Sequence, residues 1–571
     1  MSFDLANLPC EFPRKFVPAT ADLGEWSQIE PLFDQLDARE LKTTADLERW
    51  LLDRSELASA IGEEGSVRYI RMTCQTDDPE REKAFLHYVE QIEPKLKPRF
   101  DRLNKKFVAC PARAKLPQER YHVFDRSVEN RVALFREMNV PLETEEAKLC
   151  QQYQKLTGAQ TVNFDGREQT LPQMAKVQEE PDRARRQQAW ELVAERRLRD
   201  RDSLNKFFDD LFALRQRIAR NAGFANYMEF AFRDRERFDY TPNDCLDFQS
   251  AVQKHLVPLA RKLQEQRQKK LGVSPLRPWD LAVDPENKPP LKPFTESRVL
   301  IDRCTEIFDK LDTKLATDFR RMAKLDLLDL DNRKGKAPGG YQSNLTERRL
   351  PFIFMNAVGL DRDVRVLLHE AGHAFHSWEC RNEPLAEYRG APLEFCEVAS
   401  MSMELLANPH LDAFYDPADV ERSRREHLEG IVKFFPWCAT IDAFQHTLYM
   451  QPQMKVEQRE ELWLALHKCF GGIESWEGYE PALRSSWHRQ LHLFTNPFYY
   501  IEYGIAQLGA LGIWQQSLRD PAAAVRSYRR ALALGGSRPL PELFAAAGLR
   551  FDFGEKTIAA IADTLGKELA L

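Results

Sequence analysis

The chain has 571 residues, of which 43% are hydrophobic and 30% charged, so it is long enough for a sizeable core and two or more subdomains. Lysine and arginine total 82 against 88 aspartate and glutamate residues, which gives a net charge of −6. This balance argues against a general nucleic-acid-binding protein. The most apolar stretch, residues 505–514, is too short to span a bilayer and predicts a buried helix.

The cysteines and the N-terminus favour an intracellular protein. Ten cysteines occur without a CxxC pair. The first residues lack the basic start and apolar core of a secretory signal. We therefore expect a cytoplasmic protein with reduced thiols. The sequence makes no prediction of the oligomeric state.

The first part of the chain predicts helices. Residues 1–190 are expected to form an N-terminal helical region, and residues 191–571 the remaining, functional region. From Leu204 to Ile218, apolar residues recur at helical intervals, and the following Asn221 and Gly223 supply a stop.

Prolines and glycines then mark the approach to a short β-structure. Residues 275–293 contain six prolines and predict an extended connection. A loop at 335–340, rich in glycine, precedes a β-like run at 351–356. The whole chain is therefore expected to be mostly α-helical, with a small β-sheet.

The segment His369-Glu370-Ala371-Gly372-His373 carries the strongest chemical signal. Residues four apart leave the same face of a helix, so His369 and His373 can bind one metal ion. Glu370 leaves the helix beside them and can take a proton from a water molecule on that ion. Asp361 or Asp363 is expected to cap the first turn, and Gly372 to allow another backbone or the substrate to approach closely.

A second helix is predicted at residues 392–406, and its carboxylates are the candidates for a third ligand. This segment is rich in apolar residues, so a carboxylate within it is unfavourable unless it is paired or bound to metal. Glu394, Glu397 and Glu404 all fall roughly along one stripe of this helix. Their spacing alone does not choose between them.

Residues 492–503 contain a second chemical cluster, one histidine followed by three tyrosines. Two histidine ligands with an adjacent glutamate are the working parts of a zinc peptidase. Hydrolysis of a peptide builds negative charge on the former carbonyl oxygen, and imidazole or phenol donors can stabilise that charge. Tyr500 and Tyr503 are three residues apart and can share one helical face. His492 and Tyr499 are the other members of this cluster.

The sequence HEAGHAFH followed by PLEFCEVASMSMELL resembles the M3 family of zinc oligopeptidases, especially its oligoendopeptidase F branch. Further similar segments cover most of residues 200–550: they lie at 221–227, 276–280, 335–341, 351–356, 540–544 and 547–548. The first 190 residues fit this family only in their general helical character.

The resemblance implies a zincin-type helical metallopeptidase with a deep substrate cleft beside the small sheet. It identifies Glu397 as the third zinc ligand after His369 and His373, and it makes Glu404 a partner that orients a ligating histidine. It also implies that His492, Tyr500 and Tyr503 bind the substrate and stabilise its oxyanion. Because family members differ in the spacing of this segment, Tyr499 is an alternative to one of the tyrosines.

The expected function is therefore hydrolysis of short unfolded oligopeptides, with one zinc ion per chain. Glu370 takes a proton from the attacking water and delivers it to the leaving amine. Two alternatives stay open: a zinc carboxypeptidase of related helical fold, and a peptide-binding protein without catalysis. Cobalt or manganese can replace zinc as far as ligand type is concerned.

Overall fold

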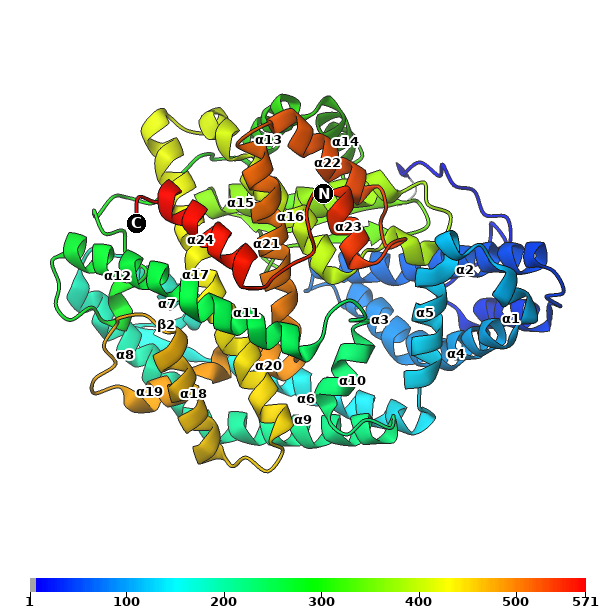
Figure 1. Cartoon of the computed structure of the whole chain (residues 1–571), viewed down its shortest axis with the longest axis horizontal. Helices are drawn as coiled ribbons and strands as arrows, with labels where there is room; N and C mark the ends of the chain where they lie inside the picture. Colours follow the sequence, from blue (N-terminus) through cyan, green and yellow to red (C-terminus); the bar gives the residue numbers. More distant parts are fainter. Residues whose placement is uncertain (1–6) are drawn as a thin grey trace. The chain divides into compact units, whose positions relative to one another are not determined.

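The computed structural model describes residues 7–571, which divide into two compact units (Figure 1). Each unit is assembled from three stretches of chain. Unit 1 contains the described chain up to Ala133, Leu291–Arg424 and Ala506–Phe551. Unit 2 contains Leu134–Pro290, Arg425–Ile505 and Asp552–Leu571. The expected division near residue 190, between an N-terminal and a functional region, stays a prediction.

Unit 1 combines helices from the N-terminal and central parts of the chain with a small sheet. Its N-terminal helical elements are α1 (Trp26–Ala38), α2 (Thr44–Cys74), α3 (Pro79–His87), the π-helical η2 (Tyr88–Ile92), α4 (Glu93–Ala109), η3 (Pro111–Lys115) and α5 (Gln118–Leu134). Its later helical elements are α13 (Ser297–Leu311), α14 (Thr313–Lys324), α15 (Asp361–Cys380), η6 (Ala386–Arg389), α16 (Leu393–Leu406), η7 (Asn408–Ala413), α22 (Pro521–Leu532) and α23 (Leu540–Ala546).

The sheet of unit 1 has three strands in the order β3-β5-β4. The strands are β3 (Leu328–Asp331), β4 (Tyr341–Leu345) and β5 (Leu350–Ala357). The central strand β5 is parallel to β3 and antiparallel to β4, and all but one of its residues are buried. Helix α15 packs against β5, and α16 packs against α15. The sheet therefore supports the helix that carries the two candidate histidine ligands.

Unit 2 is helical apart from one hairpin, β1 (Thr161–Phe164) and β2 (Arg167–Thr170). Its first helical elements are η4 (Glu137–Asn139), α6 (Val140–Gly158), α7 (Leu171–Val177), α8 (Arg183–Arg199), α9 (Arg201–Asn221), α10 (Tyr227–Asp234), α11 (Pro242–His255), α12 (Val257–Leu271) and η5 (Pro278–Asp280). The later ones are α18 (Val456–Phe470), α19 (Glu480–Arg484), η8 (Ser486–Arg489), α20 (Leu491–Thr495) and α24 (Glu555–Glu568). Within each of two helices, α17 (Pro417–Met450) and α21 (Tyr500–Ser517), the chain passes from one unit to the other.

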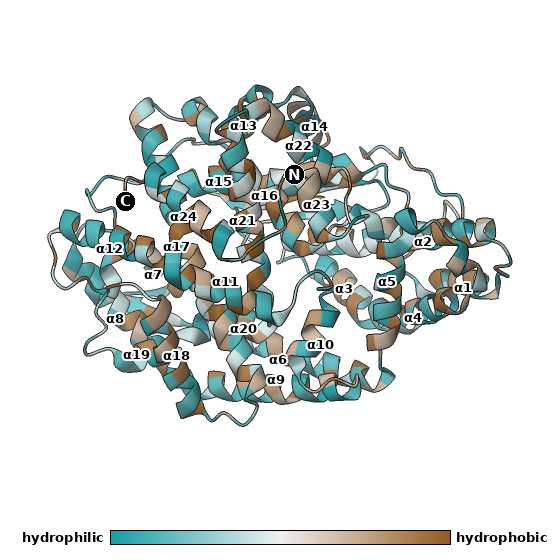
Figure 2. Cartoon of the chain, viewed as in Figure 1, coloured by the Kyte–Doolittle hydropathy of each residue, from teal (hydrophilic) through white to brown (hydrophobic). Residues whose placement is uncertain are grey.

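Amphipathic helices build the core of each unit, as the brown and teal faces in Figure 2 show. In unit 1, α1, α2, α4 and α5 enclose a cluster that includes Trp50, whose indole donates a hydrogen bond to the Leu36 carbonyl. In unit 2, the apolar face of α9, with Phe208 buried, packs in a cluster with Trp463 and Trp487. Burial of these apolar faces is the main force that holds each helical layer together.

The mostly helical fold and its principal elements are confirmed. The predicted helices at 204–218 and 392–406 are α9 and α16, and the β-like run at 351–356 lies within β5. Gly223 ends the α9 segment with a φ of 92°. The predicted connection at 275–293 contains only the short η5 as regular structure. The apolar segment 505–514 is buried within α21, as expected.

Two β elements were not predicted. The β1–β2 hairpin turns at Asp165 and Gly166, which both have positive φ. Asp-Gly is a strong signal for a two-residue hairpin turn, but the second strand, Arg167–Thr170, has no apolar residue, so the alternation that completes the signal is present only in the first strand. Strand β3 had no comparable signal, because it is only four residues long.

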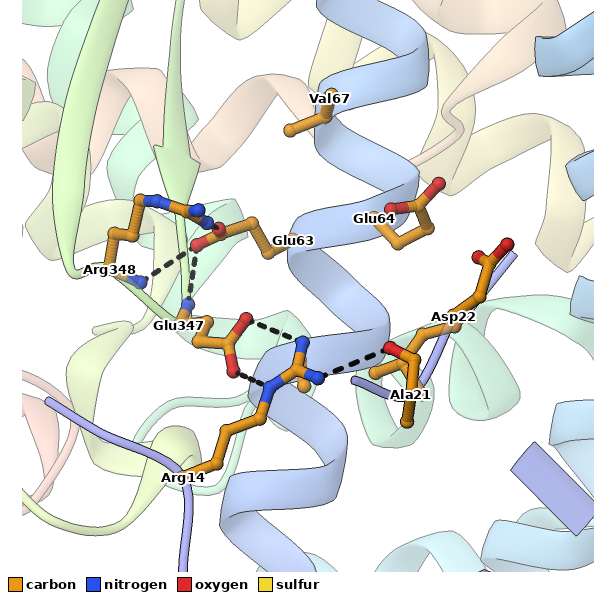
Figure 3. A pocket seen from close by; sticks show the side chains of 10 residues that line it. Arg14, Ala21, Asp22, Glu63, Glu64, Val67, Glu347 and Arg348 are labelled. Atoms are coloured by element: carbon orange, nitrogen blue, oxygen red, sulfur yellow. Dashed lines mark hydrogen bonds and ion pairs between the residues drawn. The ribbon is translucent and has the colours of Figure 1, made fainter. Parts of the chain in front are cut away.

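The β4–β5 turn is anchored to α2 beside a cavity of about 230 Å³ (Figure 3). The buried carboxylate of Glu63 accepts hydrogen bonds from the backbone amides of Glu347 (2.9 Å) and Arg348 (2.8 Å), and it also pairs with the Arg348 guanidinium. Arg14 pairs with Glu347 from the other side. These contacts fix the position of β4, the edge strand of the sheet.

Replacing Glu63 with glutamine is expected to lower the free energy of unfolding by about 1–3 kcal/mol, because a buried charged acceptor of three half-buried donors is lost. The matched control is Glu64→Gln, which affects a partly exposed pair with Arg68 and should change that free energy by less than about 1 kcal/mol. Chemical denaturation of both variants measures the difference. Equal losses would show that Glu63 does not anchor the turn.

No helix in residues 7–571 combines the length and the apolarity that crossing a bilayer requires.

Candidate metal centre

Helices α15 and α16 approach each other closely at Gly372. A β-carbon added there would lie 2.6 Å from both the Ala399 carbonyl oxygen and the Ser400 α-carbon. Only glycine allows this contact between two helix backbones. The predicted close approach at Gly372 is therefore confirmed, and the approaching backbone is that of α16.

The contact brings three sequence-predicted ligands together. His369, His373 and Glu397 each offer a ligand atom within 4.8 Å of the others. The Glu397 Oε2 atom lies 3.4 Å from His369 Nε2 and 3.6 Å from His373 Nε2. Two ligands bound tetrahedrally to zinc at about 2.1 Å are separated by about 3.4 Å. The donor types and their separations therefore fit a zinc ion.

Two further side chains hold the candidate ligands in place. Glu404 lies with its Oε1 atom 2.7 Å from His369 Nδ1, on the side of the ring away from Glu397. A carboxylate in this position fixes the orientation of a ligating imidazole. Ser400 donates a hydrogen bond of 2.9 Å to Glu397 Oε2. This role of Ser400 was not predicted, although its position three residues after Glu397 places both on one helix face.

Glu394, the third carboxylate of α16, is buried near the start of the helix and does not belong to the group of ligand atoms. Cys380, two turns after His373, donates a hydrogen bond from its thiol to the Arg389 carbonyl.

At the start of α15, the Asp363 carboxylate accepts hydrogen bonds from the backbone amides of Val358 and Leu360. Asp363 is therefore the carboxylate that caps this helix.

Burial and neighbouring charges shift the pKa values of Glu370 and of the two candidate histidine ligands. Burial, with the nearby Glu397, raises the pKa of Glu370 to about 7. Burial lowers the pKa of His373 to about 4. Burial also opposes the charge on His369, but its contacts with Glu397 and Glu404 raise its pKa well above the ordinary value. A bound dication would replace that proton as the partner of the carboxylates.

The second predicted cluster lies in unit 2, whereas the candidate ligands lie in unit 1. The His492 ring centre is 5.1 Å from that of Tyr500, 5.9 Å from that of Tyr503 and 5.6 Å from that of Tyr499. Gln490 contacts His492 Nδ1 at 2.8 Å. All four aromatic residues therefore form one group, and the choice between Tyr499 and Tyr500 stays open.

Replacing Ser400 with alanine is expected to weaken zinc binding by about tenfold, because Glu397 loses the hydroxyl that orients it. Ser402→Ala is the matched control: this serine is buried two residues further along α16, and its hydroxyl has no hydrogen-bond partner within the described chain. Competition with a fluorescent zinc chelator measures both affinities. An unchanged affinity in Ser400→Ala would show that the hydroxyl does not position the ligand.

The chain is similar to known peptidases of one family. Residues 176–563 match the model of peptidase family M3, and residues 20–135 match that of the peptidase M3 N-terminal domain. The chain is 25% identical over 303 residues to an oligoendopeptidase F homolog of Borreliella burgdorferi, which is 50% of this chain and 49% of the relative. It is 25% identical over 321 residues to the oligopeptidase PepF of Bacillus subtilis, 54% of this chain and 46% of the relative. The chain thus spans about half the length of these relatives.

The fold is also similar to a solved structure, PZ peptidase A with inhibitor 2. The two share 28% identity with a TM-score of 0.89, over 97% of this chain and 99% of that one. The family model covers well over half of the sequence and includes both α15 and α16. The chain therefore belongs to peptidase family M3.

Proposed function

We propose that this protein is a zinc-dependent endopeptidase that hydrolyses short unfolded oligopeptides in the cytoplasm. The observation that carries the proposal is the arrangement of α15 and α16, in which two imidazoles and one carboxylate converge with the separations of zinc ligands. The buried Glu370 carboxylate on the same helix supplies an acid–base group. A protein that only binds peptides has no need of such a group.

His369, His373 and Glu397 would hold the zinc ion, with Glu404 and Ser400 positioning them. Bound zinc supplies a Lewis acid and makes a coordinated water molecule more acidic. The donor set of two imidazoles and one carboxylate is typical of catalytic zinc, because it leaves a fourth position for water and substrate.

Glu370 is the proposed general base and then the general acid. Burial raises the pKa of Glu370, which favours uptake of a proton by its carboxylate. It takes the proton of the attacking water and delivers it to the nitrogen of the leaving amine. No covalent bond between enzyme and substrate is required.

The substrate is proposed to bind as an extended strand along β4. This strand lies at the edge of the sheet and pairs with β5 on one side only. An edge strand can pair with a peptide through main-chain hydrogen bonds, which do not depend on the peptide's sequence. The Gln342 amide of β4 also donates to Glu370, which connects this strand with the proposed base.

His492, Tyr500 and Tyr503 are proposed to bind the substrate and to stabilise the oxyanion, with Tyr499 as the alternative to one tyrosine. Their mutual contacts in unit 2 support a shared role. Burial lowers the pKa of His492 and raises that of Tyr500, so at neutral pH the cluster offers an uncharged imidazole and a protonated phenol. Phenol donors can stabilise a developing negative charge. The deep substrate cleft stays part of this proposal.

The proposal is tested with a set of peptides of about ten residues, long enough to occupy an extended-strand site. One member has both ends blocked, and the other has a free C-terminal carboxylate. An endopeptidase cleaves both internally, and removal of zinc by a chelator abolishes cleavage until zinc is returned. Release of single residues from the free C-terminus only would indicate a carboxypeptidase instead. Binding of both peptides without any cleavage by the zinc-loaded protein would indicate a binding protein.

A further inference from the structure

A second group of metal-binding side chains lies in unit 2, far along the chain from α15 and α16. Cys245 on α11 meets Asp442 and His446 on α17, with one ligand atom of each residue within 4.8 Å of the others. All three are buried: Cys245 and Asp442 are 0% exposed and His446 is 6% exposed. Neither the proposed reaction nor the family resemblance uses them.

The spacing of this group repeats that of the candidate centre in unit 1. Asp442 and His446 are one helical turn apart, so both leave α17 on the same face. The distance from His446 Nε2 to Asp442 Oδ2 is 3.5 Å. This is too long for a hydrogen bond but close to the separation of about 3.4 Å expected for two ligands of one zinc ion.

Two buried polar atoms of this group lack a hydrogen-bond partner within the described chain. Gln249, one turn after Cys245 on α11, donates a hydrogen bond of 2.7 Å to Asp442 Oδ2. Within residues 7–571, the buried atoms Asp442 Oδ1 and His446 Nε2 have no hydrogen-bond partner. A buried acceptor without a partner costs about 1–3 kcal/mol, and a buried carboxylate without a cation costs more.

One cationic side chain, Arg237, also lies near the group. Arg237 acts electrostatically on Cys245, but its guanidinium donates to Glu502 at 2.8 Å and also to the Phe498 carbonyl. Two apolar rings also contact the group: those of Phe232 and Phe498 pack edge-to-face with His446, with centres 6.1 and 5.5 Å away.

The donor types select the metal. One thiolate, one imidazole and one carboxylate form a mixed set that favours zinc over the hard cations magnesium and calcium. Cys438, one turn before Asp442 on α17, can supply a fourth ligand; its thiol now donates to the Tyr500 carbonyl.

We propose that Cys245, Asp442 and His446 bind a structural zinc ion that joins α11 to α17 within unit 2. The ion neutralises the buried carboxylate and gives the unpartnered His446 Nε2 atom a partner. Because a metal that binds only the folded state stabilises it, the ion strengthens this helix pair. The proposal does not depend on peptidase activity.

The test counts zinc in the full chain after loading and removal of free metal. Wild type is expected to hold two ions per chain. The double variant His369→Ala/His373→Ala should keep one ion, in unit 2, and Cys245→Ser should keep one ion, in unit 1. Cys304→Ser is the matched control, since this equally buried cysteine on α13 belongs to neither group, and it should keep two.

Cobalt substitution identifies the thiolate ligand, first in a variant whose substitutions lie in unit 1 and leave unit 2 unchanged. A thiolate bound to Co²⁺ gives a charge-transfer absorption, whereas the set His369, His373 and Glu397 contains no thiolate. The His369→Ala/His373→Ala variant loaded with cobalt should show this absorption, and Cys245→Ser should lose it. If the His369→Ala/His373→Ala variant shows neither the absorption nor bound metal, the proposal is overturned. The proposed peptidase centre would still stand in that case if wild type retains zinc in unit 1.

Discussion

Replacing Gly372 with alanine is expected to destabilise the protein by about 1–3 kcal/mol and to abolish zinc binding at the centre of unit 1. The new β-carbon would lie 2.6 Å from two backbone atoms of α16. Neither backbone atom can rotate away as a side chain would, so the two helices must separate. His373 lies on one helix and Glu397 on the other, and the separation therefore pulls the ligands apart.

Gly430→Ala is the matched control for this substitution. Gly430 is also in a helix, α17, but no atom lies within 4 Å of an added β-carbon, and the residue is exposed. Alanine there should leave stability unchanged or raise it by up to about 1 kcal/mol. Thermal unfolding and zinc content of both variants give the comparison. A Gly372→Ala protein with wild-type stability and zinc content would refute the close packing of α15 and α16.

His373→Ala is expected to lose the zinc ion of unit 1 and, with it, all peptide cleavage. Only two of the three ligands remain in the variant, and Glu397 loses one of the two imidazoles it faces. Zinc held by three protein ligands plus water depends on each of them. Metal content and cleavage of a quenched peptide, measured on the same sample, check the two parts of this prediction.

His376→Ala serves as the control for His373→Ala. His376 is one turn further along α15, is buried, and lies outside the group of ligand atoms. Its removal leaves a cavity and is expected to lower stability, but the zinc ion of unit 1 should remain. If His376→Ala loses zinc and His373→Ala keeps it, the ligand assignment is wrong.

The sequence was sufficient for the elements whose signals are local. The apolar periodicity of α9 and α16 and the spacing of His369 and His373 are set within a few helical turns, so the predicted helices agree with the structure. The close approach at Gly372 was expected as well, but not that the backbone concerned is that of Ala399 and Ser400.

Contacts between distant segments were beyond the reach of the sequence. Nothing local indicates that each unit combines three separate stretches of the chain. The same limit applies to the group in unit 2: Asp442 and His446 are one turn apart, but Cys245 comes from a helix nearly two hundred residues earlier in the sequence. Such a group becomes visible only when α11 and α17 are placed together.

The tyrosine cluster illustrates an intermediate case. The sequence placed His492 and the tyrosines near one another, and their rings are in contact. However, Tyr499 precedes α21 and stacks on His492, whereas Tyr500 begins that helix and meets the same ring edge-on. Because both contact His492, helical spacing alone does not decide which hydroxyl faces the substrate.

The central claim is that Glu370 is the general base of a zinc endopeptidase, and one measurement tests it most directly. Wild type and Glu370→Gln are each loaded with zinc, quantified for metal, and given an internally quenched peptide with both ends blocked. The account predicts equal zinc content and a kcat lowered about 10²–10⁴-fold in Glu370→Gln, since the carboxyl group acts on the proton and not on the metal. Equal cleavage rates in the two zinc-loaded proteins would contradict it.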